Sequence, residues 1–360
     1  MKINQLELSE FRNYETLSVQ FDESVNILYG DNAQGKTNVL EAIYLCGTTK
    51  SHKGSKDKEM IRLSSDESHI RMMIEKAGIP HRIDMHLRKS KAKGVAIDGV
   101  PIKRSSELMG LLHIVFFSPE DLSMIKNGPG ERRRFLDLEL CQLDQTYLYH
   151  LGNYNRAVNQ KNNLLKQIGF QKELKDTVEI WDRQLIEHGS VLIDTRKRFV
   201  DELNDLLPDI HAKLSGGKEE LYVRYEANVS KSEFGQKLAV NLEKDLILKS
   251  TSCGPHRDDI SFYVGDKNLK LFGSQGQQRT AALSLKLAEI ELVRRKIKES
   301  PILLLDDVLS ELDRNRQTYL LESITDLQTI ITCTGLEEFV DNKKRYHKIF
   351  HVVDGVLNET

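Results

Sequence analysis

The spacing of apolar residues predicts strands at both ends of the chain. Leu17, Val19 and Phe21 alternate with polar residues, and the mostly apolar run at 25–29 ends in a glycine, so we expect strands in the first 30 residues. The pattern from 69 to 117 is again typical of strands, and Asp98-Gly99 between apolar residues predicts a hairpin turn. Short aliphatic runs at 302–305 and 329–333 suit buried parallel strands.

The middle of the chain has a helical period instead. Between about 131 and 207 the apolar residues form two heptad-like runs joined at Gly169–Lys172, with Lys161 interrupting the first run. They predict an antiparallel helix pair, which could be an ordinary hairpin in a domain core or a short projecting arm. A further long helix is expected at 277–298.

Strands on both sides of a helical middle predict a discontinuous α/β domain with an insertion. We expect a head formed by residues 1–125 and 250–360, with a mixed sheet and flanking helices. Residues 126–249 would be a mainly helical insertion that carries the short, coiled-coil-like hairpin.

Composition narrows the class of protein. In 360 residues, 39% are hydrophobic and 29% charged, which allows a core and excludes wholesale disorder. No apolar run approaches a membrane span, and the first residues lack the apolar stretch of a signal peptide. The four cysteines lie far apart without a CxxC pair, which indicates a reduced, cytosolic chain without a zinc site or a disulfide framework. A net charge of −2 excludes a wholly basic nucleic-acid coat but not a local basic patch.

A nucleotide-binding motif lies between the predicted strand at 25–29 and a predicted helix. It matches GxxxxGK[ST] and consists of Gly30, Asp31, Asn32, Ala33, Gln34, Gly35, Lys36 and Thr37. The glycines let backbone N–H groups surround phosphates, and the helix N-terminus adds partial positive charge. We expect Lys36 to reach the β- and γ-phosphates of ATP and the Thr37 hydroxyl to bind Mg²⁺.

A second nucleotide motif follows the aliphatic run at 302–305. Asp306 at the end of that run is expected to hold Mg²⁺, and Asp307 to position or polarise the attacking water. Lys36 and Asp306 are 270 residues apart (306 − 36 = 270), far more than in a small GTPase or a simple kinase. The interval indicates an ATPase whose two motifs lie at opposite ends of the chain.

A third loop, Phe272–Arg279, stands immediately before the long helix expected at 277–298. Its Ser274, Gly276 and Gln277 could bind an anion at a helix N-terminus, although such loops are common. One helix ahead of Asp306, the loop resembles the signature loop of ABC-type ATPases. The segment 308–313 resembles the loop that such proteins place at their dimer interface.

Taken together, these motifs resemble those of the RecF family of bacterial recombination and gap-repair ATPases over nearly the whole chain. The segments that carry the resemblance are EFRNY, GDNAQGKTNVLEAI, FFSPEDLSMIKNGPGERRRFLD, TSCGPHRDD, SQGQQR and LLLLDDVLSELD. The resemblance implies an ABC-type head related to SMC-like repair proteins, an ATP-dependent homodimer, and DNA binding at gaps, junctions or single strands without sequence specificity. It also implies cooperation with RecO and RecR to load RecA, support of the SOS response, and a weak DNA-stimulated ATPase activity.

The resemblance also transfers roles to individual residues. Arg12 and Asn13 look like N-terminal residues that reach the nucleotide in related heads, and Ser274 looks like the signature serine that contacts the γ-phosphate of the opposite subunit. The wider ABC pattern usually has Glu at the position of Asp307, and many transporters have a histidine where this chain offers Thr332 and Thr334. Both departures favour a slow, switch-like ATPase.

Three alternative functions stay open at this point. A transporter-type head is disfavoured by the lack of a membrane-spanning segment, and a nuclease-coupled SMC-like head by the short arm. A non-catalytic scaffold that only uses ATP for stability differs from the preferred function in turnover.

Four basic segments are candidates for contact with DNA phosphates. They are Lys50–Lys58, Arg88–Lys93, Lys103-Arg104 and Arg132–Arg134. Lysine and arginine on one face would neutralise phosphates without reading bases, and the alternative is that each segment is a solvated or ion-paired surface.

Overall fold

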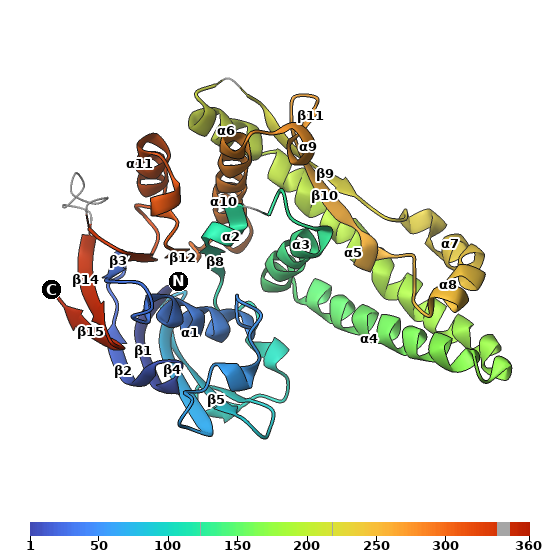
Figure 1. Cartoon of the computed structure of the whole chain (residues 1–360), viewed down its shortest axis with the longest axis horizontal. Helices are drawn as coiled ribbons and strands as arrows, with labels where there is room; N and C mark the ends of the chain where they lie inside the picture. The colour runs from blue at the N-terminus through green and yellow to red at the C-terminus, as the bar shows by residue number, and fades with distance from the viewer. Residues whose placement is uncertain (123, 218, 337–345) are drawn as a thin grey trace. The chain divides into compact units, whose positions relative to one another are not determined.

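The computed structural model describes residues 1–122, 124–217, 219–336 and 346–360 (Figure 1). The chain forms two compact units, one of Met1–Leu122 with Lys286–Thr360 and one of Ser123–Leu285. The first boundary lies close to the expected 125/126. The second lies at 285/286 instead of 249/250, because the strands that follow residue 250 pair and pack within the second unit.

The first unit contains two sheets. Among the described residues, the antiparallel sheet has the order β2-β1-β4-β5-β6-β7, with β1 at Lys2–Phe11, β2 at Tyr14–Gln20, β4 at Glu67–Lys76, β5 at Ile79–Arg88, β6 at Gly94–Ile97 and β7 at Val100–Pro101. The mixed sheet has the order β15-β14-β3-β13-β12-β8, with β3 at Val25–Tyr29, β8 at Ile114–Phe117, β12 at Ile302–Asp306, β13 at Thr329–Cys333, β14 at Tyr346–Val353 and β15 at Val356–Glu359. The helices are α1 at Lys36–Thr48, α2 at Pro119–Leu122, the later part of α10 at Gln275–Ile297, and α11 at Arg314–Ser323.

Burial in the two sheets follows the sequence pattern. Along β4, Ile70, Met72 and Ile74 are buried, whereas the residues between them face outward. Every residue of β12 and β13 is buried, as expected for central parallel strands. The predicted hairpin at Asp98-Gly99 is confirmed: it joins β6 to β7, and both residues have positive φ angles (53° and 83°).

Helix α1 contacts both sheets of the first unit. It lies against β8, β12 and β13 on one side and β4 on the other (Figure 1). The helix is buried almost all round, from Val39 to Thr48, because each of its faces meets a sheet. Its N-terminus is thereby held at the edge of the mixed sheet where β3 ends.

The second unit contains the predicted helix pair and a small antiparallel sheet. Its elements are α3 at Pro129–Leu143, α4 at Gln145–Ile168, α5 at Val178–Asn204, α6 at Leu207–Ser215, β9 at Leu221–Glu226, α7 at Phe234–Val240, α8 at Leu242–Leu248, β10 at Asp259–Val264, β11 at Lys267–Asn268, α9 at Leu269–Phe272 and the first part of α10. Strands β9, β10 and β11 form the sheet, and α5 contacts β9. The second helix of the pair starts later than predicted, because Lys172–Thr177 form a 3-10 turn that includes Leu174.

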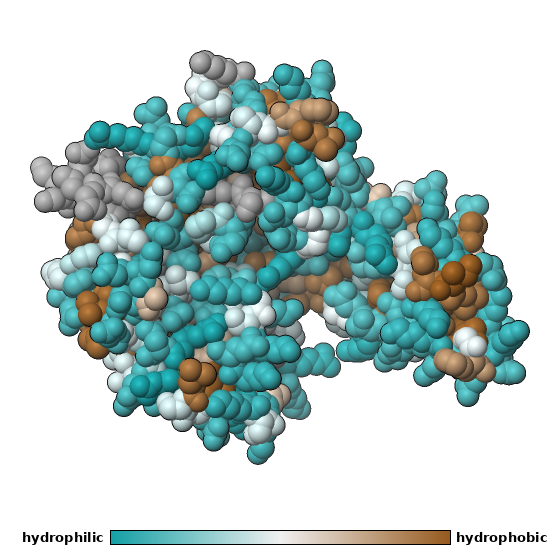
Figure 2. All heavy atoms as spheres, viewed as in Figure 1, coloured by the Kyte–Doolittle hydropathy of each residue, from teal (hydrophilic) through white to brown (hydrophobic). Residues whose placement is uncertain are grey.

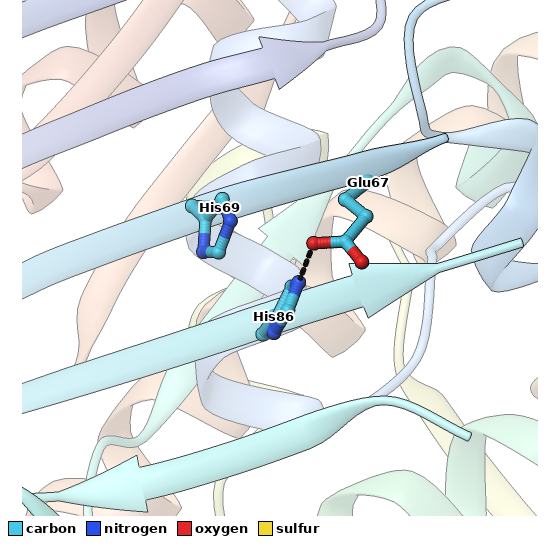
Figure 3. Close-up of side chains that lie close together, drawn as sticks. All are labelled: Glu67, His69 and His86. Atoms are coloured by element: carbon cyan, nitrogen blue, oxygen red, sulfur yellow. Dashed lines mark hydrogen bonds and ion pairs between the residues drawn. The ribbon is translucent and has the colours of Figure 1, made fainter. Parts of the chain in front are cut away.

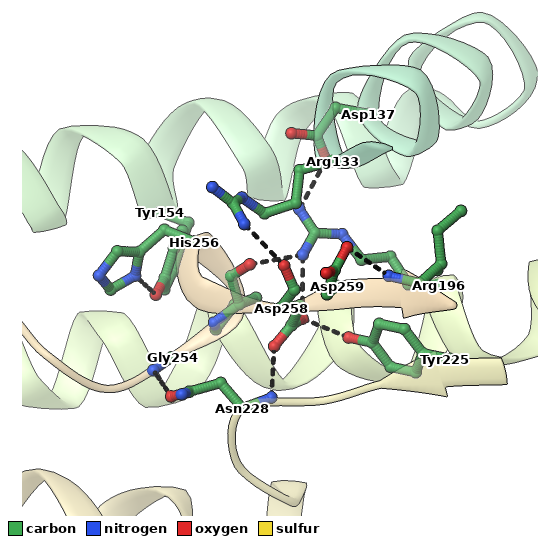
Figure 4. Close-up of polar contacts among 12 residues, drawn as sticks. Arg133, Asp137, Tyr154, Arg196, Tyr225, Asn228, Gly254, His256, Asp258 and Asp259 are labelled. Carbon is green, nitrogen blue, oxygen red and sulfur yellow. Dashed lines mark hydrogen bonds and ion pairs between the residues drawn. The ribbon is translucent and has the colours of Figure 1, made fainter. Parts of the chain in front are cut away.

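A buried polar network ties α3, α4, α5 and the β9–β10 pair together (Figure 4). The Arg196 guanidinium of α5 donates to Asp258 (3.0 Å), Asp137 (2.7 Å) and the Pro255 carbonyl (2.6 Å). Asp258 also accepts from the Tyr225 hydroxyl and the Asn228 backbone N–H. Burial raises the pKa of Asp258, although Arg196 opposes that shift, so the carboxylate depends on these donors.

The basic segment Arg132–Arg134 is partly explained by the same region. Arg132 is buried, and its guanidinium forms two hydrogen bonds with Asp259 (2.7 and 2.8 Å). Arg133 donates to the Asp258 backbone carbonyl (2.7 Å). The expectation that this segment contacts DNA phosphates is therefore wrong for Arg132, because its charge is compensated inside the unit. Ser123, in the motif that carries this segment, lies outside the described residues.

Apolar side chains are also exposed in the second unit. Figure 2 shows apolar atoms gathered over α7 and α8, where Val240, Ile247 and Leu248 are exposed. Across the ranges that the structure describes, no helix combines the length and the apolar character needed to cross a bilayer.

Candidate nucleotide-binding site

The loop between β3 and α1 has a shape that two of its residues can adopt only as glycine. Gly30 has φ +148°, and a Cβ there would lie 2.4 Å from the Val352 carbonyl oxygen of β14. Gly35 has φ +114°, and its Cβ would lie 2.6 Å from the Asn13 amide and 2.9 Å from the Tyr14 hydroxyl. The loop therefore turns sharply between β14 on one side and the Asn13-Tyr14 side chains on the other. Asp31, Asn32 and Ala33 are exposed at its outer side.

The two nucleotide motifs meet at the carboxyl edge of the mixed sheet. Strand β13 pairs in parallel with both β3 and β12, so the ends of all three strands reach one edge. The Thr37 hydroxyl donates to Asp306 Oδ1 at 2.8 Å, across 269 positions of sequence. The Thr332 hydroxyl of β13 donates to the same oxygen at 2.8 Å. Asp306 is thus held by hydroxyls from two other elements.

Lys36 is folded back over its own loop. Its ammonium donates to the carbonyl oxygens of Gly30 (2.5 Å) and Asp31 (2.8 Å), and the side chain is buried. Burial lowers the pKa of Lys36, and Asp307 gives the largest opposing effect. The ammonium therefore stands at the inner side of the loop, close enough to Asp307 and Asp306 to feel both charges.

Asp307 directly follows β12 in an uncommon backbone conformation. Its φ is +53°, and its backbone N–H donates to the Thr332 hydroxyl (3.0 Å) and carbonyl (3.2 Å). Burial raises the pKa of the Asp307 carboxyl, while Lys36 acts against this rise. A carboxylate with a raised pKa is a better proton acceptor than an ordinary surface aspartate.

Of the two N-terminal residues predicted to reach the nucleotide, Asn13 lies at the loop. Its amide donates to the Gln34 carbonyl (2.9 Å), and its oxygen accepts from Asn38 of α1 (2.8 Å). Asn38 was not among the predicted site residues, although its place directly after the motif is visible in the sequence.

Arg12 instead contacts the body of α1. Its guanidinium forms two hydrogen bonds with Glu41 (2.7 and 2.8 Å) and one with the Glu59 carbonyl (2.7 Å). Burial works against the charge of Glu41, but hydrogen bonds from Arg12 and Ser51 outweigh it and keep its pKa below the usual range. A direct role of Arg12 at the nucleotide stays a prediction.

The turn at Asp354-Gly355, which was not among the predicted site residues, also contacts the loop. The backbone N–H of Asp354 donates to the Gln34 side-chain oxygen (2.6 Å), and that of Gly355 donates to the Gln34 carbonyl (3.2 Å). The Asp-Gly pair between apolar residues is a hairpin signal, but its position beside a loop 320 residues earlier has no local signal.

The signature-like loop lies in the second unit, at the start of α10. Ser274 and Gln277 form a reciprocal cap: the Ser274 backbone N–H donates to the Gln277 side chain (2.9 Å), and the Gln277 backbone N–H donates to the Ser274 hydroxyl (3.2 Å). Gln277 also donates to Glu219 (2.7 Å), and Gly276 leaves open space where a Cβ would lie, its nearest neighbour being the Ser274 hydroxyl at 3.9 Å. Their participation in a nucleotide site stays a prediction.

Comparisons with known proteins show what the chain is similar to. A family model described as the RecF/RecN/SMC N-terminal domain matches residues 2–358. A DNA replication and repair protein RecF from Lachnoclostridium phytofermentans is 62% identical over 359 residues, which cover 100% of both chains. Another, from Agathobacter rectalis, is 59% identical over 355 residues, which cover 99% of this chain and 98% of the relative.

Solved structures show the same relationship. The recombination mediator protein RecF with ATP, in the RecFOR pathway, has a TM-score of 0.92 and 33% identity, over 99% of this chain and 97% of that one. An Smc head bound to the C-winged helix domain of ScpA has a TM-score of 0.58 at 18% identity, over 100% of this chain and 97% of that one. The second likeness shows the fold alone, and the predicted ABC-type head is confirmed.

Proposed function

The chain belongs to the RecF/RecN/SMC N-terminal domain family, and within it to the RecF proteins, and from this premise we propose that it is an ATP-switched DNA-binding protein of recombinational repair. The observation that carries the proposal is the 2.8 Å hydrogen bond between Thr37 and Asp306, which joins the two nucleotide motifs. A second support is that RecF has been solved with ATP.

The loop fits the phosphates of ATP. At Gly30 and Gly35 a Cβ would collide with neighbouring atoms, so the loop keeps a narrow backbone cradle of the kind that binds phosphates. Lys36 stands at the inner side of this cradle and would turn from the carbonyls of its own loop to the β- and γ-phosphates. The Asn13 amide holds the loop from outside it, through its hydrogen bond to the Gln34 carbonyl.

Thr37 and Asp306 fit a magnesium ion. Mg²⁺ binds oxygen ligands at about 2.0–2.1 Å in octahedral geometry, which places adjacent ligands about 2.9 Å apart. The Thr37 hydroxyl and the Asp306 carboxylate are already 2.8 Å apart. When bound, the ion would neutralise phosphate charge, and Thr332 would keep the Asp306 carboxylate in position.

Asp307 is the residue that we assign to hydrolysis. Its raised pKa suits a group that takes a proton from water, and the positive φ fixes its direction after β12. Its side chain is one methylene shorter than the glutamate usual in ABC proteins. We therefore expect slow turnover, with ATP binding and hydrolysis switching the protein between two states.

We further propose that ATP joins two copies of the chain, each loop facing the Ser274 loop of the other copy. The dimer would hold gapped or junction DNA through phosphates and work with RecO and RecR to load RecA, which supports the SOS response. RecF in the RecFOR pathway supports these partners. Three of the basic segments, Lys50–Lys58, Arg88–Lys93 and Lys103-Arg104, lie in the same unit as the loop and are the candidates for contact with DNA phosphates. Four free, buried cysteines support a cytoplasmic site of action.

Sedimentation with ATP, ADP or no nucleotide, each with and without gapped DNA, tests the proposal. The wild type should form dimers on DNA with ATP, and Lys36→Met should not. Asp307→Asn should keep ATP-dependent dimers, slow hydrolysis by about a hundredfold or more, and hold DNA longer. Lys166→Met, an exposed lysine on α4, is the matched control and should behave like the wild type.

The outcomes separate the alternatives. ATP-dependent dimers of Lys36→Met equal to wild type would refute the nucleotide site. Turnover unchanged in Asp307→Asn would remove that residue from hydrolysis. A wild type that binds DNA with ATP but never hydrolyses it would indicate a non-catalytic scaffold.

A further inference from the structure

Two histidines and a glutamate lie together on the outer face of the antiparallel sheet, in the first unit (Figure 3). Glu67 and His69 are two positions apart on β4, so both side chains leave the same face of the strand. His86 of β5 is the direct cross-strand partner of His69. The sheet therefore places all three side chains on one surface, and each of them comes from a strand.

The three side chains are close enough to share one ion. Each offers one ligand atom, and these atoms lie within 4.8 Å of one another. A tetrahedral site with bonds of about 2.0–2.1 Å needs its ligand atoms about 3.3 Å apart. In Figure 3, His86 Nε2 is joined to Glu67 Oε2 by a hydrogen bond of 2.7 Å, and the His69 ring stacks on His86 with centroids 4.1 Å apart. Small rotations of these surface side chains would reach the required spacing.

The surroundings leave room for the ion, and two nearby arginines are engaged with other groups. Arg71 pairs with Asp84 (2.8 Å) and Glu7 (3.6 Å), and Arg88 donates to the Ala92 carbonyl (3.0 Å). His69, His86 and Gly94 line a hollow of about 620 Å³ on this face. A Cβ at Gly94 of β6 would meet the Arg88 guanidinium at 3.8 Å and the His86 Cβ at 3.9 Å, both ordinary contact distances, so this position beside His86 is not crowded.

We propose that Glu67, His69 and His86 form a binding site for a divalent transition-metal ion of the Zn²⁺ type. Two imidazoles and one carboxylate are ligands that Zn²⁺ accepts, whereas Mg²⁺ prefers oxygen alone. Three protein ligands leave one position for water. Bound metal would link the first residues of β4 to the last residues of β5, in the middle of the strand order. The cysteine spacing, from which no zinc site was expected, does not bear on a site formed by histidines and a glutamate.

Calorimetric titration of the metal-free full chain with ZnCl₂ tests the proposal. The wild type should bind one more Zn²⁺ than the His69→Ala/His86→Ala double variant, and Glu67→Gln should weaken that site by about tenfold or more. Glu67→Gln keeps the side-chain length and a hydrogen-bonding oxygen, so it tests the charge alone. Zn²⁺ should also raise the melting temperature of the wild type more than that of the double variant.

His81→Ala is the matched control. His81 is also on β5 and pairs with Asp98 (2.9 Å). Among the described residues, His81 belongs to no group of three possible metal ligands. It should keep wild-type zinc binding. Equal zinc binding by the wild type and the double variant would overturn the proposal, as would an equal loss in His81→Ala. Glu67→Gln carries the test if the double variant does not fold.

Discussion

At the scale of single residues, one backbone oxygen determines what can stand at position 30. Gly30→Ala would bring a Cβ to 2.4 Å from the Val352 carbonyl in a conformation with φ +148°. Because that neighbour is backbone in a paired strand, the clash cannot be relieved by a side-chain rotation. We expect a loss of about 3 kcal/mol in the free energy of unfolding, and loss of ATP binding.

Gly78→Ala is the control for this prediction. Gly78 also has a positive φ (+76°), but nothing lies within 4 Å of its Cβ position. It should lose only about 1–2 kcal/mol, the cost of the left-handed conformation. Urea denaturation followed by far-ultraviolet circular dichroism measures both. Equal losses of unfolding free energy in the two variants would show that the close contact with the Val352 carbonyl of β14 is unimportant.

His256 makes the second unit sensitive to acid. Its Nε2 donates to the Thr251 carbonyl (2.9 Å) and its Nδ1 accepts from Tyr154 (2.7 Å), which satisfies the neutral ring. Burial, followed by the charge of Arg257, lowers its pKa from 6.5 to about 4. The unfolded chain therefore takes up the proton first, so stability is complete above pH 6.5 and falls as the pH drops toward 4.

We expect this histidine to cost the second unit about 2 kcal/mol of stability between about pH 7 and pH 5. His256→Gln retains a donor and an acceptor and should flatten that part of the pH profile. Urea unfolding followed by Trp181 fluorescence is the measurement, because Trp181 is the single tryptophan and lies in this unit. A profile equally steep in the variant would place the acid sensitivity elsewhere.

At the scale of elements, the helix pair is joined by a buried charge. Lys161 of α4 is fully buried and contacts Asp182 of α5 (2.7 Å) and Asp245 of α8 (3.4 Å). Lys161→Met leaves two carboxylates uncompensated and should destabilise the second unit by about 3–5 kcal/mol. Adding Asp182→Asn and Asp245→Asn should restore much of the loss, again measured by Trp181 fluorescence. No recovery would mean that Lys161 matters for packing alone.

Lys161 also shows where sequence patterns stop being informative about elements. The heptad pattern predicted both helices, but Lys161 appeared in it as an interruption. The reason is that its two partners come from other helices, Asp182 from α5 and Asp245 from α8. Similarly, the sequence predicted Arg132 as part of a basic surface. Its partner Asp259 lies 127 positions later and comes close to it only in the folded chain. Motifs with fixed spacing, such as the loop at 30–37, were located from sequence, whereas contacts between distant segments, such as Gln34 with Asp354, were not.

At the scale of the whole molecule, the proposed dimer has two composite sites. Ser274→Arg would add bulk and charge at the second unit's helix cap, and should block dimerisation without preventing ATP binding by the monomer. Mixing Ser274→Arg chains with Lys36→Met chains gives a dimer in which one site carries both defects and the other carries neither. We expect partial ATP-dependent dimerisation to return.

Sedimentation of the mixed chains, with each variant alone as reference, measures this recovery. Ser232→Arg, at an exposed serine of the same unit, should dimerise like the wild type. If Ser274→Arg alone loses ATP binding as a monomer, the loop acts on its own chain and the shared-site proposal fails.

The strand order of the mixed sheet has a consequence for synthesis on the ribosome. Strand β3 pairs only with β13 and β14 among the described strands, and β14 ends 324 residues after β3 (353 − 29 = 324). At a translation rate of roughly 5–20 residues per second, β3 waits roughly 15–65 s for its neighbours. Residues 123–285 emerge complete within that interval and can fold first. The nascent loop at 30–37 therefore acquires its final shape only after β13 and β14 have been synthesised, and until then the apolar strand β3 lacks its partners.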